Sequence, residues 1–217
     1  MIRKINFYSL AYFSACLISL FFIDTNASIT EMIVKIMALV FLSFLYLSSS
    51  KKINYFYLFI LMNSLASDTF LIFDDDFLLL GTSLLLANRI LYIIIARKAF
   101  LETKTNILLT YLIPSLLLFA IIFVLLRPYL QEISLSFLFM GISSSIIIGL
   151  AFFNYLNKMN TKNKFFLFGV LLIVTADVLI AINKFLDYLL VYVIIYTSMY
   201  YVARYLICQS MIERTNR

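Results

Sequence analysis

Long apolar runs separated by short charged or polar clusters dominate the sequence. A helix that crosses the hydrocarbon core of a membrane needs about 20 mostly apolar residues, and eight stretches of this kind can be marked out. Their predicted limits are 5–23, 29–47, 53–73, 77–96, 106–126, 133–156, 165–183 and 188–208. The links between them hold only a few residues. The pattern therefore predicts an all-α protein, in which residues 1–217 form one transmembrane domain of eight helices.

The composition excludes most other classes of protein. Hydrophobic residues make up 64% of the chain and charged residues 13%, whereas soluble domains hold about 45–50% apolar and 25% charged residues. The 4 Gly and 2 Pro are too few for a barrel of short strands joined by turns. The chain has no His, and its 2 Cys, Cys16 and Cys208, are far apart. We therefore expect no metal site, no cofactor and no disulfide framework.

The basic residues predict the orientation of the bundle. Most of the 17 Lys and Arg residues fall in links on one side, and only Arg127 and Lys184 fall on the other. Cytoplasmic loops carry the positive excess, so we expect both termini in the cytoplasm and the bundle in a plasma (inner) membrane of bacterial type. The net charge of +6 then indicates affinity for anionic lipid headgroups, not for nucleic acid. The first span follows Arg3 and Lys4 like a signal peptide, but it is longer than a cleavable core, so we expect it to stay.

Ionisable residues inside predicted spans are the first candidates for a site, because each costs about 2.5–3.5 kcal/mol to insert. They are Lys35, Asp68, Arg89, Asp177 and Arg204. At 1.5 Å per residue, Lys35, Asp68 and Asp177 share one level near the outer surface, whereas Arg89 lies nearer the middle. We expect Arg89 to pair with Asp68 on the adjacent span. Arg204 falls close to the cytoplasmic edge, where it could snorkel.

Each of these residues also has a structural interpretation. The two Asp could lock helices together, with Ser67, Thr175 or Lys35 as partners. Lys35 follows Glu31 by one helical turn, so these two could form an ion pair. The tyrosines of the last span are typical of packing or of the membrane interface.

Two further features concern the arrangement of the helices. Residues 67–73 are similar to residues 176–182 and lie four spans earlier, which suggests a parallel repeat of four plus four helices. The sixth span carries small residues that permit close helix packing, Gly141, Gly149 and the serines at 143–145.

Four stretches and one lysine resemble a known family. The stretches are SLASDTFL at 64–71, FLLLGTSLLLANRILY at 77–92, FGVLLIVTADVLIAINKF at 168–185 and YYVARYL at 200–206. Together with Lys35 at the start of the second span, their order and spacing resemble the YhhN-type integral membrane family, whose characterised members are lysoplasmalogenases. The resemblance covers nearly the whole chain and agrees with eight spans.

The chain departs from the pattern of that family at several positions. Ser67 and Ala176 replace the residues that precede the two Asp, Asn88 stands at the position of a histidine, and Arg204 stands at that of a glutamine. An asparagine cannot exchange protons as a histidine does. The unchanged residues are Lys35, Asp68, Tyr92 and Asp177.

The resemblance implies cleavage of the vinyl-ether bond of a lysoplasmalogen, which releases a fatty aldehyde and a glycerophospho-alcohol. This reaction needs a protonated acid and a group that activates water, and we assign Asp68 and Asp177 these roles without deciding which is which. The expected partner is a lysophospholipid or another single-chain lipid within the membrane. The predicted substrate-binding residues are Lys35, Asn88, Arg89, Tyr92 and Arg204.

Two other functions stay open at this point. A small transporter or a lipid-binding protein would also carry charges inside the membrane, and the absence of the family histidine favours an inactive relative of this kind. Alternatively the charges are purely structural, and their substitution would mainly lower stability.

Overall fold

The computed structural model describes residues 7–23, 28–72, 74–98, 105–130, 134–186 and 188–216, and within them it contains eight α-helices and no strand. The helices are α1 (Phe7–Leu20), α2 (Ser28–Ser49), α3 (Tyr55–Ile72), α4 (Asp74–Lys98), α5 (Thr105–Leu130), α6 (Ser134–Asn157), α7 (Thr161–Phe185) and α8 (Leu190–Thr215). The all-helical prediction is confirmed, and 7 of the helices are long and apolar enough to cross a membrane. The exception is α1, which has 14 residues. The predicted signal-like residues Arg3 and Lys4 lie outside the described residues.

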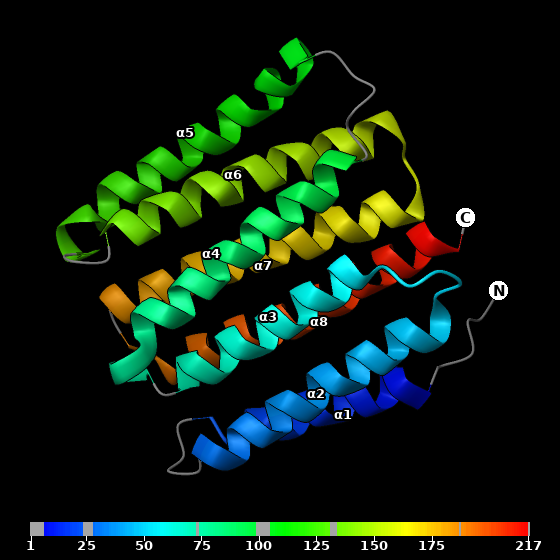
Figure 1. The fold of residues 1–217 in the computed structure, drawn as a ribbon. Coiled ribbons are helices and arrows are strands. Elements are labelled where there is room, and N and C mark those ends of the chain that lie inside the picture. Colours follow the sequence, from blue (N-terminus) through cyan, green and yellow to red (C-terminus); the bar gives the residue numbers. More distant parts are fainter. Residues whose placement is uncertain are drawn as a thin grey trace.

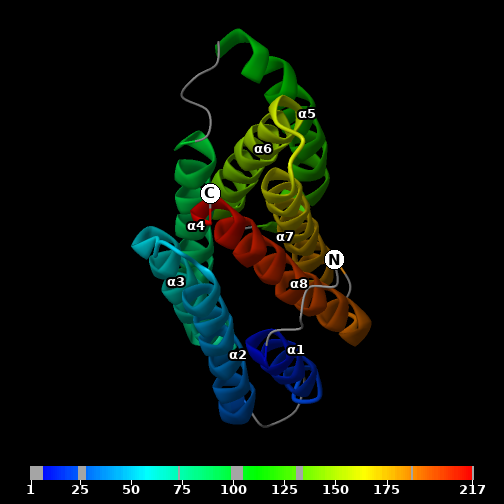
Figure 2. The same cartoon turned by 90° about the vertical axis from the view of Figure 1, so that its right-hand side faces the viewer.

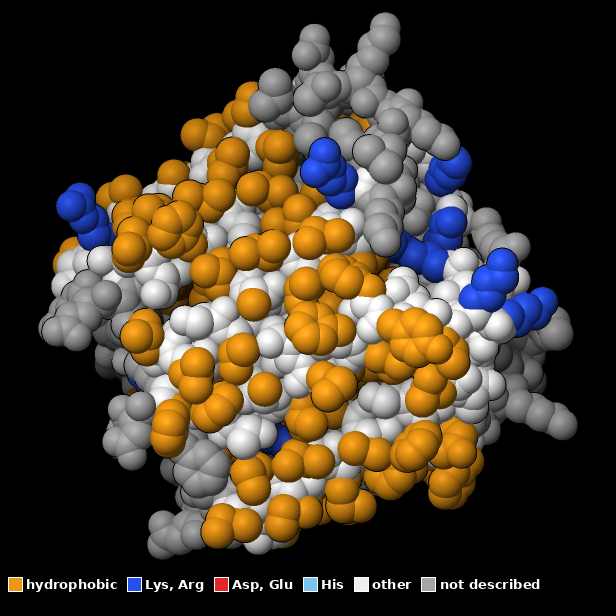
Figure 3. All heavy atoms as spheres, viewed as in Figure 1, with side chains coloured by type: hydrophobic (Ala, Val, Ile, Leu, Met, Phe, Trp, Pro, Cys, Tyr) orange, Lys and Arg blue, Asp and Glu red, His pale blue; other side chains and the backbone are white. Residues whose placement is uncertain are grey.

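The first turn of α1 and the last turn of α8 lie at the same end of the bundle (Figure 1). Most of the Lys and Arg side chains visible in Figure 3 gather at this end, whereas the face between the two ends is largely apolar. Exposed apolar side chains among the described residues include Met62, Val124 and Leu125. A large exposed apolar surface is what a helix bundle presents to lipid. The arrangement therefore agrees with the uneven distribution of basic residues along the sequence.

Helices α2, α3, α4, α6, α7 and α8 form a closed ring, and Figure 2 shows the bundle from one end. Around this ring the close contacts are α2–α3, α3–α4, α4–α6, α6–α7, α7–α8 and α8–α2, and α1 packs on α2 and α8. The remaining helix, α5, lies outside the ring and packs mainly on α6 (Figures 1 and 2). In a repeat of four plus four helices, α5 would correspond to α1, and both helices lie outside the ring. Contacts between helices alone do not establish that the two halves superpose, so the predicted repeat is not confirmed.

Small residues allow α5 to pack closely on α6, as the sequence predicts. The Phe119 ring of α5 lies over Gly141 of α6, and a Cβ atom added at Gly141 would come within 1.7 Å of it. Nearby, the Ser115 hydroxyl donates to the Ser145 carbonyl at 3.1 Å, and the Ser145 hydroxyl donates to the Ser115 carbonyl at 3.2 Å. These reciprocal hydrogen bonds fix the position of α5 along α6.

We expect Gly141→Ala to destabilise the protein by about 1–3 kcal/mol, which is the usual cost of forcing an extra group into a packed interface. The ring of Phe119 would have to move away from α6. The measurement is unfolding of the purified protein in detergent. Val124→Ala, on the exposed side of α5, is the matched control and should change the stability little. Equal effects of the two substitutions would contradict the packing argument.

Candidate functional site

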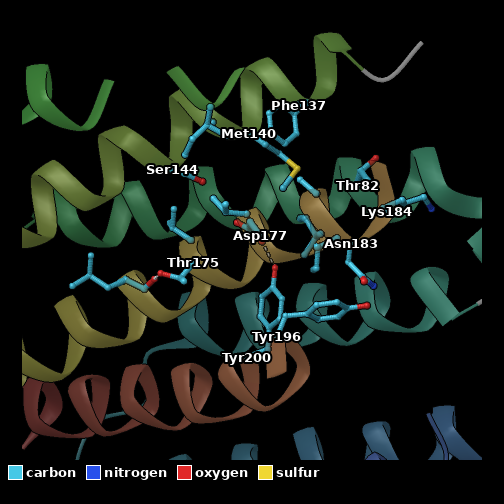
Figure 4. Close-up of a pocket in the computed structure, with 18 of the residues that line it drawn as sticks. Thr82, Phe137, Met140, Ser144, Thr175, Asp177, Asn183, Lys184, Tyr196 and Tyr200 are labelled. Atoms are coloured by element: carbon cyan, nitrogen blue, oxygen red, sulfur yellow. Dashed lines mark hydrogen bonds between the residues drawn. The ribbon is translucent and has the colours of Figure 1, made fainter. Parts of the chain in front are cut away.

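A cavity of about 1170 Å³ is lined by residues from α2 to α8. One part of its wall is charged and polar, and includes Glu31, Lys35, Asp68, Asp177, Tyr200 and Arg204. The wall along α5 and α6 is mostly apolar, and includes Leu118, Phe119, Ile122, Phe137, Met140 and Phe152. Figure 4 shows Phe137 and Met140 of α6 on the side of the cavity opposite Tyr200 of α8. The cavity is therefore amphipathic.

Asp177 of α7 is held by two donors that come from different helices. Arg89 of α4 donates from Nη2 to its Oδ2 at 2.5 Å, and Tyr200 of α8 donates to its Oδ1 (Figure 4). The side chain of Arg89 is 3% exposed and that of Asp177 is 11% exposed. Asp177 lines the cavity, whereas Arg89 lies behind the wall. Both carboxylate oxygens of Asp177 are thus engaged from outside the cavity or from its edge.

Asp68 of α3 forms a second ion pair, with Arg204 of α8. Arg204 donates from Nη1 to Oδ2 at 2.5 Å and from Nη2 to Oδ1 at 2.6 Å, which is the two-pronged geometry that suits a guanidinium and a carboxylate. Both side chains line the cavity. The predicted pairing of Arg89 with Asp68 is wrong, because Asp68 faces α8 across the interior of the ring and Arg89 faces α7.

The prediction that Arg204 snorkels to the surface is also wrong. The predicted span ended at residue 208, but α8 continues to Thr215, which adds roughly 10 Å at 1.5 Å per residue. Arg204 is accordingly buried, with 6% of its side chain exposed, and it does not reach the surface.

Tyr200 connects the two ion pairs. It lies one turn before Arg204 on α8, so the two side chains share a face of the helix. Its hydroxyl donates to Asp177, and the Arg204 guanidinium carbon lies 5.7 Å from the centre of its ring, within reach of a cation–π interaction. Tyr200 is one of the tyrosines of the last span, for which packing or a place at the membrane interface was predicted. The spacing of four residues from Arg204 is the signal that could have identified it.

The ion pairs reach across the ring. Neither pair joins two helices that pack closely within the described part of the chain, where α3 packs on α2 and α4, and α8 on α7, α1 and α2. Long arginine side chains therefore bridge the space between facing helices. This geometry keeps charged groups on the wall of the cavity.

Lys35 pairs with Glu31 on α2, and the two atoms Nζ and Oε1 lie 2.6 Å apart. The predicted ion pair between these residues, one helical turn apart, is therefore confirmed. Both residues line the cavity, so the pair is also part of the candidate site. Ser67 and Thr175 are not partners of the two Asp, because their hydroxyls donate to the carbonyls of Gly81 and Leu171.

Asn88 and Tyr92 of α4 lie in the interface with α3 and do not line the cavity. The Asn88 side chain accepts from Asn63 at 2.9 Å and donates to Ser64 at 3.1 Å. Tyr92 is 3% exposed. The structure thus places these two predicted binding residues, like Arg89, behind the wall, whereas Lys35, Asp68, Asp177 and Arg204 lie together around the cavity.

Comparison with known proteins adds a family. No curated protein and no solved structure matches the chain. A family model described as the YhhN family matches residues 30–211, a range that contains every residue of the candidate site named above. Because the match extends over most of the 217 residues, the chain belongs to the YhhN family.

Proposed function

We propose that this protein is a membrane hydrolase of the lysoplasmalogenase type, which cleaves the vinyl-ether bond of a single-chain phospholipid. The observation that carries the proposal is the cavity, in which two partly buried carboxylates share one space with a long apolar wall. Its volume of about 1170 Å³ exceeds the roughly 300–1,000 Å³ of most small-molecule sites. A lipid with one hydrocarbon chain and a phosphate headgroup has the same division into apolar and charged parts.

The residues of the cavity suggest how the chemistry would proceed. Protonation of the alkenyl carbon that does not carry the ether oxygen gives an oxocarbenium ion, which water then attacks. Asp68 and Asp177 would supply the acid and the base. The negative charge that stays on one of them would also stabilise the cation. The chain would lie along α5 and α6, and the cations Lys35 and Arg204 would face the phosphate.

One observation favours a second candidate, a protein that binds or transports a lipid without cleaving it. Each carboxylate is already engaged by an arginine, and an ion pair of this kind can be purely structural. Asn88, at the position of the family histidine, is bound to neutral side chains of α3. This candidate uses the same cavity for binding alone.

The deciding experiment is the release of fatty aldehyde by the purified protein in detergent or in liposomes. The substrate is a lysoplasmalogen, and the control is the ester lysophospholipid with the same chain length. Aldehyde release from the first alone would support a hydrolase. Saturable binding of both lipids without aldehyde, or movement of either across a proteoliposome membrane, would support the second candidate.

A further inference from the structure

The two ion pairs differ in how a ligand could reach them. Asp68 and Arg204 both line the cavity, whereas Asp177 lines it and Arg89 does not. Arg89 is 2% exposed and holds Asp177 from behind. A molecule in the cavity can therefore contact Arg204 directly, but it cannot contact Arg89. Only one of the two carboxylates can lose its arginine to a ligand.

We propose that the phosphate of a bound single-chain lipid takes Arg204 from Asp68, and that Asp68 then takes up a proton and becomes the acid of the reaction. The proposal rests on the proposed hydrolase function and adds the division of roles between the two carboxylates. It also resolves how a site whose carboxylates are both paired could supply an acid. Binding of the lipid headgroup would thus generate the acid that the reaction needs.

Arg204 is suited to exchange one partner for the other. A guanidinium offers parallel N–H groups that match a phosphate as well as a carboxylate, and Nη1 and Nη2 now make such a pair of bonds with Asp68. When Arg204 exchanges Asp68 for the phosphate, the Tyr200 ring beside the guanidinium would keep the guanidinium in place. The exchange therefore needs a change in side-chain torsion and no movement of α8.

The surroundings of Asp68 would favour the neutral form once Arg204 is engaged elsewhere. Titratable groups near it include Tyr92 of α4, Tyr201 of α8 and Cys16 of α1, none of which supplies a positive charge. The other charged groups of the cavity wall are the Glu31–Lys35 pair, Asp177 and Lys184. With a lipid in the cavity, Asp68 would lose both its arginine and its contact with water, and a carboxylate in that position neutralises by binding a proton.

Asp177 would stay ionised through the same event, because Arg89 and Tyr200 occupy its oxygens. Each carboxylate oxygen has a second lone pair, so Asp177 can still accept a hydrogen bond from water. It is therefore the base of this scheme.

The remaining steps return both carboxyl groups to their starting states. The Asp68 proton forms a C–H bond with the alkenyl carbon that does not carry the oxygen. The double bond becomes a single bond, and the positive charge is shared by the ether oxygen and the carbon attached to it. Water adds to that carbon and gives its proton to Asp177. The resulting hemiacetal loses its hydroxyl proton to Asp68, and its carbon–oxygen bond breaks as Asp177 returns a proton to the glycerol oxygen. The products are the aldehyde and the glycerophospho-alcohol, and both carboxyl groups are restored.

Proton uptake on binding tests the proposal without any cleavage. The ligand is a lysophospholipid with a saturated ether chain, which has no vinyl group. It is added to the full-length protein in weakly buffered detergent solution with a pH indicator. We expect uptake of about one proton for each bound lipid. A neutral alkylglycerol with the same chain should bind without uptake. Inorganic phosphate at the same concentration should cause no uptake, because it lacks the chain that holds the lipid in the cavity. Binding of the phospholipid with no proton uptake would overturn the proposal, and equal uptake with inorganic phosphate would overturn its assignment to a lipid.

Two variants test which carboxyl group takes up the proton. Asp68→Asn should abolish the uptake, and Asp177→Asn, as the matched control, should retain it. The opposite result would overturn the assignment of roles. The wild-type comparison of charged and neutral ligands needs neither variant, so the proposal can be tested even where a variant folds poorly. Aldehyde release without proton uptake would overturn the exchange at Arg204 alone, whereas uptake without aldehyde release would overturn the hydrolase function and leave the exchange as a response to binding.

Discussion

Asp177→Asn is expected to lower the rate of aldehyde release from lysoplasmalogen by about 10²–10⁴-fold, the usual contribution of a general acid or base. The substitution keeps the shape of the side chain, and its amide oxygen can still accept from Arg89 or Tyr200. It removes the negative charge and the ability to take a proton from water. The loss should therefore appear in kcat, while binding of a saturated ether lysophospholipid persists.

Thr175→Val is the matched control for this prediction. Thr175 lies half a turn before Asp177 on α7 and also lines the cavity. Its hydroxyl donates to the Leu171 carbonyl in its own helix at 2.9 Å, so it contributes no acid or base. We expect Thr175→Val to change the rate only slightly. If Asp177→Asn kept most of the wild-type rate, Asp177 would not be part of the reaction.

The eight helices could be predicted because insertion of a helix depends on local hydrophobicity. The predicted limits of the helices were less accurate, and the error at the last helix changed the predicted surroundings of Arg204. The last helix continues to Thr215 rather than ending at residue 208, since a polar stretch at the end of a span need not stop the helix. Arg204 consequently lies deeper than the sequence indicated. The peripheral position of α5 also has no local signal, because its apolar residues would suit either the ring or the outside.

The charged residues were identified from the sequence, but their partners were not. Adjacent spans are the natural first choice for a pair, and this choice placed Arg89 beside Asp68. The actual partner of a side chain depends on the rotation of each helix and on which helices face each other across the ring. Asp68 therefore meets Arg204, and Arg89 meets Asp177. Only the pair within one helix, Glu31 and Lys35, could be predicted, because helical spacing alone brings these two residues together.

The difference between the two arginines should also be visible in stability. Arg89→Met is expected to lower the free energy of unfolding by about 3–5 kcal/mol, because it leaves the partly buried Asp177 without its arginine. Arg204→Met should cost less, since Asp68 is the more exposed of the two carboxylates, with 17% of its side chain exposed against 11% for Asp177. Unfolding of both variants in the same mixed micelles measures the difference.

A double variant separates the ion pair from the packing of its side chains. In Arg89→Met with Asp177→Leu no charge is left unpaired, and apolar replacement of a buried pair is often neutral or stabilising. The Arg89 Nε group, which is buried without a hydrogen-bond partner, is removed at the same time. We therefore expect the double variant to regain most of the stability lost in Arg89→Met, although it would lack the base. Losses that simply add would show that packing, and not charge, makes Arg89 important. Recovery of stability without activity would mean that this pair is kept for its chemistry, because an apolar pair would hold α4 and α7 together as well.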